Sequence, residues 1–158
     1  MTIKQAPEPA PSWQVAHWLN TPEPLSLEGL RGKVVVLHAF QMLCPGCVAH
    51  GLPQTQRAFE TFDHDQVAVV GLHTVFEHHD AMTATALKAF VHEYRLTFPV
   101  GIDSPNGRGS PKTMTAYQMQ GTPTLILIDR QGKLRRQAFG QYNDLSLGAD
   151  IMSLILEQ

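Results

Sequence analysis

The 158-residue chain has only two cysteines, little charge, and no apolar run long enough to cross a membrane. The longest apolar runs, such as residues 34–37 and 125–128, are far shorter than the ~20 residues that a membrane-spanning helix needs. Two cysteines cannot build the disulfide framework of a small secreted domain. Twelve Lys and Arg against 14 Asp and Glu give a formal net charge of −2. The composition therefore predicts neither a nucleic-acid partner nor a membrane partner.

The N-terminal segment and the overall composition predict one domain with a short tail. Residues 1–11 are rich in proline and lack the apolar core of a secretory signal, so we expect a flexible tail and a cytoplasmic protein. Residues 12–158 are expected to form one domain, because 43% of the chain is hydrophobic and its length suits a single core.

Hydrophobic patterns along the chain predict an α/β domain. Apolar, β-branched runs at Val34–Phe40 and Val67–His73 are typical of buried parallel strands. Thr124–Ile128 and Leu134–Phe139 flank a turn sequence and predict a hairpin. Helices are expected at 47–62, at 84–94 and at 147–155. Pro53 should kink or break the first of them, and Thr83 should be the N-cap of the second. Residues 101–111 are expected to form a loop. The order is therefore β–α–β–α–β–β–α, with a mixed sheet flanked by helices and a C-terminal hairpin and helix.

Both cysteines lie in a single C-x-x-C motif between a predicted strand and a predicted helix. At a helix start, free N–H groups and the helix dipole favour a thiolate at Cys44, and a thiolate is the nucleophile of disulfide exchange. Cys47, three residues later, can resolve the mixed disulfide that results. Between them, Pro45 lacks a backbone N–H, and Gly46 lets the turn close and another chain approach. This setting predicts a redox-active pair.

Two other readings of the cysteines stay open. The first is a metal-binding module, in which the two thiols with His50 or His73 could hold copper or zinc. His73, His78 and His79 also follow the second strand, with nearby carboxylates. Consecutive histidines on a polar loop are more often simply solvated, so no metal site is predicted.

The second open reading is a thiol peroxidase. Peroxiredoxins carry the motif P-x-x-x-T-x-x-C, but here Leu37 and Gln41 occupy the Pro and Thr positions before Cys44. Counting from Cys47 places Phe40 and Cys44 there instead. Neither register supplies the motif, so peroxide reduction is the weaker alternative.

From Trp13 onward the sequence resembles the thioredoxin-fold redoxins, and within them the TlpA/ResA-like thiol-disulfide oxidoreductases, which border the AhpC/TSA peroxiredoxins. The resemblance lies in residues 27–37, the C-P-G-C motif, the Gly-Thr-Pro-Thr of residues 121–124 after Tyr117, and residues 128–133. It implies a thioredoxin-like fold, with Cys44 as the attacking thiol and Cys47 as the resolving one. It also implies a cis Thr122–Pro123 peptide bond facing the cysteines, with the Thr122 backbone pairing with the substrate chain.

The chain departs from the family pattern around the motif. Leu43 replaces the usual tryptophan, the inter-cysteine pair is Pro-Gly, and Pro53 follows Cys47 by six residues rather than five, as if the helix held one extra residue. His38 occupies the place of the buried acidic residue of thioredoxins, and His50 that of a glutamate in the ResA-like branch. Either imidazole could accept a proton from a cysteine. Alternatively, His38 is a hydrogen-bonded core residue and His50 a solvated residue of the helix.

The sequence thus predicts a thiol–disulfide oxidoreductase without a bound cofactor, since no nicotinamide or flavin motif is present. The expected partners are a protein disulfide substrate and a thiol donor such as a thioredoxin or glutathione system. Whether the pair reduces or oxidises its substrate stays open.

Overall fold

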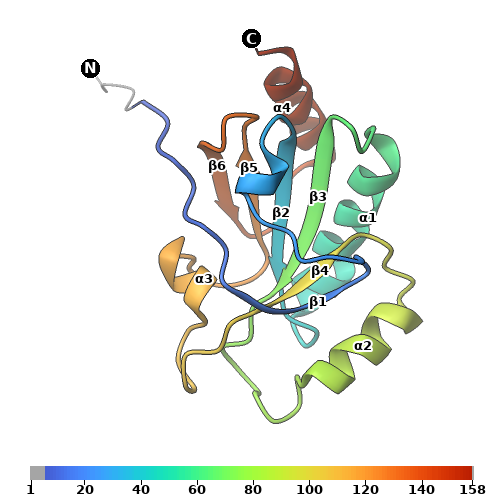
Figure 1. The fold of residues 1–158 in the computed structure, drawn as a ribbon. Helices are drawn as coiled ribbons and strands as arrows, with labels where there is room; N and C mark the ends of the chain where they lie inside the picture. Colours follow the sequence, from blue (N-terminus) through green and yellow to red (C-terminus); the bar gives the residue numbers. More distant parts are fainter. Residues whose placement is uncertain (1–5, 158) are drawn as a thin grey trace.

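The computed structural model describes residues 6–157, which form one six-stranded sheet covered on both faces (Figure 1). The strands are β1 (Val15–Leu19), β2 (Val34–Phe40), β3 (Val67–His73), β4 (Val100–Asp103), β5 (Thr124–Ile128) and β6 (Leu134–Phe139). Their order in the sheet is β1-β4-β3-β2-β5-β6. β2, β3 and β4 are parallel, whereas β1, β5 and β6 join the sheet antiparallel. The fold is a mixed α/β sheet of the thioredoxin-like kind, as the sequence predicts.

The central strand β2 contributes to two separate cores because its side chains alternate between the two faces of the sheet. Val34 and Val36 pack with α1 (Leu52–Thr61), α2 (Ala84–Glu93) and α4 (Asp144–Leu156). Val35 and Leu37 pack on the opposite face with α3 (Lys112–Ala116) and with apolar residues of the N-terminal segment. All seven residues of β2 are buried. This strand is therefore held from both sides up to the point where the C-x-x-C loop leaves it.

Most of the predicted elements are confirmed, but the sequence missed three. The strands β2, β3, β5 and β6 have the predicted bounds, and Thr83 caps α2 by accepting a hydrogen bond from the Ala86 N–H. β4 begins at Val100, one residue before the segment expected to be a loop, and takes up the first three residues of that segment; β1 and α3 were not expected. Gly101 helps to explain why β4 was not predicted, since glycine is uncommon inside strands. A Cβ at Gly101 would lie 2.9 Å from Val15, so the glycine allows β1 and β4 to approach.

The predicted flexible tail is only partly within the described residues. Residues 1–5 lie outside them, whereas Glu8 to Pro11 is hydrogen-bonded rather than loose. The Leu134 N–H donates to the Glu8 carbonyl (2.8 Å), and the Ala10 N–H donates to the Gly132 carbonyl (2.9 Å). The N-terminal segment thus lies along the β5–β6 turn. No helix within residues 6–157 is long and apolar enough to cross a membrane.

The helix that follows the cysteines begins with a π-helical turn, Cys47–Gly51, and continues without a break as α1. A π-helical turn is how a helix accommodates one added residue. This agrees with the longer spacing between Cys47 and Pro53. The helix continues through Pro53 instead of breaking there, and its geometry changes from π-helical to α-helical immediately before this proline.

Gly51 lets this turn pack directly on β2. A Cβ at Gly51 would lie 2.5 Å from the imidazole of His38 and 3.4 Å from Pro123. His38 is itself 2% exposed, so its ring has little room to move. The missing side chain at Gly51 therefore fixes how closely the helix, the strand and the proline loop approach.

We predict that Gly51→Ala lowers the free energy of unfolding by about 1–3 kcal/mol, because the added methyl overpacks the contact with His38. The matched control is Gly148→Ala in α4, because an added Cβ there would have no atom of another part of the chain within 4 Å. It should raise the free energy of unfolding by about 0.5–1 kcal/mol through helix propensity. Urea denaturation measures both. Equal stabilisation by the two substitutions would contradict the tight contact at Gly51.

Candidate active site

The two cysteines form a disulfide just beyond the C-terminal end of β2, in the loop at the lower end of the sheet in Figure 1. Their Cα atoms are 5.2 Å apart. Cys44 is half-buried, whereas Cys47 is fully buried. The Cys47 N–H points at the Cys44 Sγ atom at 3.3 Å, and the Val48 N–H donates to the Cys44 carbonyl at 3.1 Å. The helix start therefore offers positive partial charge to the accessible sulfur, which favours its thiolate once the disulfide is reduced.

The loop that precedes β5 lies opposite this disulfide. The Thr122–Pro123 peptide bond is cis, as the family resemblance implied. The Cys44 Sγ atom lies 3.5 Å from the Thr122 carbonyl oxygen, and a Cβ at Gly46 would lie 3.5 Å from Pro123. Thr122 and Pro123 thus face the motif, and Gly46 keeps the space between the helix and Pro123 narrow. Pro45 is exposed.

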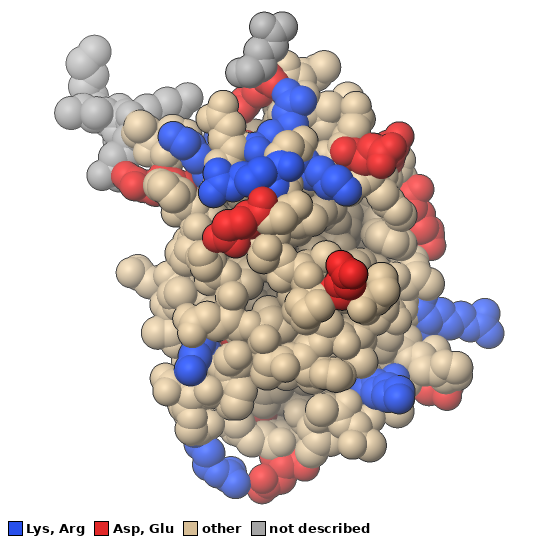
Figure 2. Space-filling model, in the orientation of Figure 1, with Lys and Arg blue, Asp and Glu red and all other residues tan. Residues whose placement is uncertain are grey.

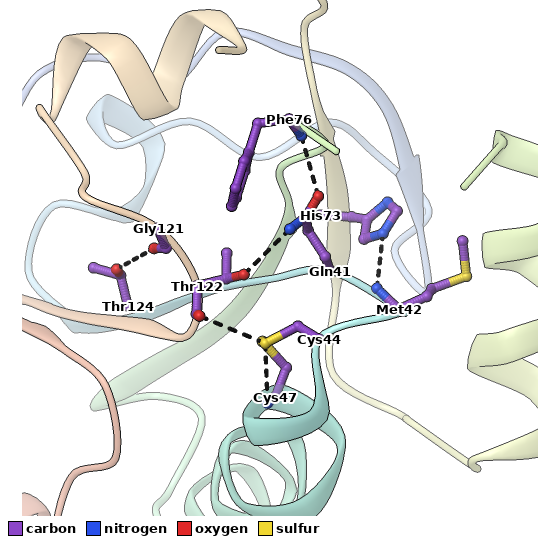
Figure 3. The surroundings of a disulfide bond; sticks show 9 residues. All are labelled: Gln41, Met42, Cys44, Cys47, His73, Phe76, Gly121, Thr122 and Thr124. Carbon is purple, nitrogen blue, oxygen red and sulfur yellow. Dashed lines mark hydrogen bonds between the residues drawn. A yellow bond between two sulfur atoms is a disulfide. The ribbon is translucent and has the colours of Figure 1, made fainter. Parts of the chain in front are cut away.

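Two buried side chains fix the loop before Cys44 (Figure 3). The sequence analysis considered His73 only as a metal ligand, and Gln41 only as a departure from the peroxidase motif. His73, 1% exposed at the end of β3, accepts a hydrogen bond from the Met42 N–H through Nε2 at 3.2 Å. The Gln41 amide connects this loop to Thr122 and to the segment after β3. A polar residue between the apolar strand and the motif was the only sequence signal for Gln41.

His38 and His50 lie at one cavity, separate from the exposed side of Cys44. The cavity measures about 380 Å³ and is also lined by Gly51, Pro123 and Arg57, but by neither cysteine. His38 is buried, and neither ring nitrogen has a hydrogen-bond partner within the described residues. Burial lowers the pKa of His38 from 6.5 to about 4, so its imidazole is neutral near pH 7. His50 is exposed in the π-helical turn.

The histidines considered as metal ligands do not come together with the cysteines. His73 is engaged with the loop before Cys44, and burial lowers its pKa from 6.5 to about 4. His78 is exposed and His79 half-buried in the loop before α2. Within residues 6–157, no three His, Cys, Asp or Glu side chains are placed to hold a metal ion.

A second cavity, of about 320 Å³, lies beside the exposed sulfur of Cys44, and we call it the Cys44 groove. Its lining is mainly apolar or uncharged, with Glu77 as the one acidic side chain: Gln41, Leu43, Cys44, Pro45, Phe76, Glu77, His78, Met82, Gln120, Gly121, Thr122 and Phe139. Leu43 and Phe139 are 57% and 56% exposed, which is unusual for large apolar side chains. Such a surface is suited to an extended, uncharged segment of another chain.

Charge gathers away from this groove. In Figure 2 the Lys and Arg side chains cluster toward the upper end of the molecule, whereas the surface below them is mostly uncharged. A cavity at the β5–β6 turn is lined by Arg130, Lys133 and Arg135 together with Asp129 and Glu157. Arg135 pairs with both of these carboxylates, so this cluster is largely neutralised by its own neighbours.

The strand–C-x-x-C–helix unit, the cis-proline opposite it and the sheet order define a protein of the thioredoxin fold. The AhpC/TSA family model matches residues 7–137, and the chain belongs to that family as a thioredoxin-fold redoxin. A thioredoxin-like superfamily protein of known structure is 56% identical with a TM-score of 0.94, covering 96% of this chain and 98% of that one. A thiol-disulfide isomerase from Corynebacterium glutamicum is 51% identical with a TM-score of 0.90, covering 94% and 98%.

The curated relatives have lower sequence identity to this chain than these two structures, and the chain matches only part of the length of each relative. The thiol-disulfide oxidoreductase ResA of Bacillus thuringiensis is 30% identical over 118 residues, which are 74% of this chain and 61% of ResA. Protein DipZ of Mycobacterium bovis is 27% identical over 129 residues, which are 80% of this chain but 18% of DipZ.

We predict that the free energy of unfolding decreases as the pH falls from 6.5 to 4. The folded-state pKa values of His38 and His73 are about 4, so the unfolded chain binds more protons across this window. Each imidazole accounts for a loss of up to about 3 kcal/mol. Urea titrations at several pH values should show a weaker dependence for His38→Leu, whereas the exposed His92→Gln variant should keep that of the wild type. The same dependence in His38→Leu as in the wild type would contradict the burial of a neutral imidazole.

Proposed function

We propose that the chain is a thiol–disulfide oxidoreductase that exchanges disulfides with a protein substrate through Cys44 and Cys47. The observation that carries this proposal is the unequal burial of the two sulfurs. Cys44 borders a mainly uncharged groove, whereas Cys47 is fully buried behind it. An incoming chain can therefore reach only one sulfur of the pair, which suits an attacking and a resolving cysteine. The similarity to ResA, a thiol-disulfide oxidoreductase, and to the Corynebacterium thiol-disulfide isomerase supports the same class of reaction.

In the reducing direction, the Cys44 thiolate attacks one sulfur of the substrate disulfide. A Cys44–substrate bond forms, the substrate disulfide breaks, and the departing cysteine sulfur takes up a proton. Cys47 then loses its proton and attacks the Cys44 sulfur, which releases the second substrate thiolate. The substrate has gained two electrons, and the Cys44–Cys47 pair is oxidised, as in the structure. A thiol donor, such as a thioredoxin or glutathione system, reduces the pair again; an oxidant runs the same steps in reverse.

His38 is the proposed acceptor of the Cys47 proton. Its two ring nitrogens have no partner within residues 6–157, and it lies against the π-helical turn that begins at Cys47. The buried imidazole is a weak base by itself, so in this proposal the negative charge of the Cys47 thiolate would have to favour its protonated form. The cavity shared with exposed His50 offers water a route to carry the proton away.

The Cys44 groove is the proposed docking place for the substrate. Leu43, Phe76 and Phe139 offer apolar contacts beside the reactive sulfur, and the Thr122 carbonyl lies next to that sulfur. We propose an extended segment with an apolar side chain near its cysteine as the substrate class. The peroxidase alternative has less support, because Gln41 stands where that motif has threonine, and its amide oxygen already accepts from two backbone N–H groups. The cytoplasmic location stays a prediction.

We predict that Cys47→Ser accumulates a mixed disulfide between Cys44 and a protein substrate, because the resolving thiol is gone. Reduced Cys47→Ser protein would be mixed with oxidised insulin as a generic disulfide substrate and analysed by non-reducing electrophoresis and mass spectrometry. The matched variant Cys44→Ser should give at most about a tenth of this product, since its remaining thiol is fully buried. Equal trapping by the two variants would contradict the assigned roles.

A further inference from the structure

Among residues 6–157, the Gln41 side chain forms the only polar link between two opposite sides of the Cys44 groove. Its side chain is 3% exposed, in the loop between β2 and Cys44. The Oε1 atom accepts hydrogen bonds from the Phe76 N–H at 3.1 Å and the Glu77 N–H at 3.3 Å. The Nε2 atom donates to the Thr122 Oγ1 atom at 3.4 Å (Figure 3). One amide thus binds two segments that are far apart in sequence.

Those two segments are the walls of the groove. Phe76 and Glu77 line it on one side, and Gly121 and Thr122 line it on the other. The walls already come close at Gly121, where a Cβ would lie 4.0 Å from Phe76 and 3.1 Å from Phe139. Thr122 also places its carbonyl oxygen 3.5 Å from the Cys44 sulfur. The length of the Gln41 side chain therefore sets the separation of the walls next to the reacting atom.

The Phe76 and Glu77 N–H groups lie in a segment without regular structure, between β3 and α2. Their hydrogen bonds to Gln41 take the place of the backbone pairing that a strand or helix would supply. Without a buried acceptor, these N–H groups must turn toward water, because leaving them unpaired in the interior is unfavourable. Removing the Gln41 side-chain amide should therefore displace the segment of Phe76 and Glu77 that lines the groove.

We propose that Gln41 is a positioning residue that holds the Cys44 groove at the width needed to bind a protein substrate. This inference rests on the proposed function. Gln41 acts on the binding of an extended chain, which touches both walls. It has little effect on a small disulfide, which needs only the Cys44 sulfur.

The test compares two substrates in Gln41→Met, where the side chain keeps its length and loses its amide. Reduction of insulin, with dithiothreitol as the electron donor, reports on the groove. The stoichiometric reaction of pre-reduced protein with 5,5′-dithiobis(2-nitrobenzoate), without added dithiol, reports on the sulfur alone. We expect KM for insulin to rise by about fivefold or more, whereas the second-order rate constant for the small disulfide should stay within about twofold of the wild type.

Two further variants separate positioning from general damage to the fold. Thr122→Val removes only the hydroxyl that accepts from Gln41, and it should raise KM for insulin by about twofold. In Gln41→Glu, one carboxylate oxygen can accept from the Phe76 and Glu77 amides and the other from the Thr122 hydroxyl, so KM for insulin should stay at the wild-type value, below that of Thr122→Val. Its negative charge should move the pH profile for the small disulfide to higher pH, because it opposes formation of the Cys44 thiolate.

The results decide between the possibilities. An equal loss of activity toward both substrates in Gln41→Met, or no loss toward either, would overturn the positioning role. If Gln41→Met does not fold, the KM values of Thr122→Val and Gln41→Glu decide, and a rise in Gln41→Glu as large as in Thr122→Val would overturn it. Wild-type protein that reduces neither substrate would instead overturn the proposed function, and this inference with it.

Discussion

The burial of β2 along its whole length is the constraint on which the rest of the site depends. Because both faces of this strand are covered, its C-terminal end holds the C-x-x-C loop in one place relative to β3 and β5. His73 at the end of β3 binds the loop from one side, and the cis-proline segment before β5 faces it from the other. The groove, the disulfide and the buried imidazole of His38 thus all take their positions from one strand.

The chemistry of the pair follows from a difference in environment between two identical side chains. Cys44 combines access to a mainly uncharged groove with the N–H groups of a helix start, whereas Cys47 lies in the apolar core beneath that helix. Access to water and the helix N–H groups favour a thiolate at Cys44, whereas burial opposes charge at Cys47. The π-helical turn and Gly51 bring this buried side close to His38 and Pro123. The reaction can therefore begin at an exposed sulfur and end at a protected one.

The sequence predicts the elements whose residues repeat a simple pattern and misses those made by contacts between distant segments. The apolar runs of β2 and β3 define those strands to the residue, but four-residue β4 contains a glycine and forms only where β1 and β3 pair with it. The cysteines are recognisable because strand, C-x-x-C and helix follow one another directly. The role of Gln41 is not, because no local pattern tells which backbone N–H groups a loop amide will meet. The cis bond before Pro123 was expected only through the family resemblance.

The central claim is that Cys44 and Cys47 form a redox-active pair rather than a structural disulfide. Equilibration of the protein in graded dithiol buffers, followed by alkylation and mass spectrometry, gives the potential of this pair directly. We expect one reversible two-electron step between about −270 mV, the value of thioredoxin, and about −120 mV, the value of a strong disulfide oxidant. A potential below about −300 mV, typical of structural disulfides, or no reversible step at all, would contradict it.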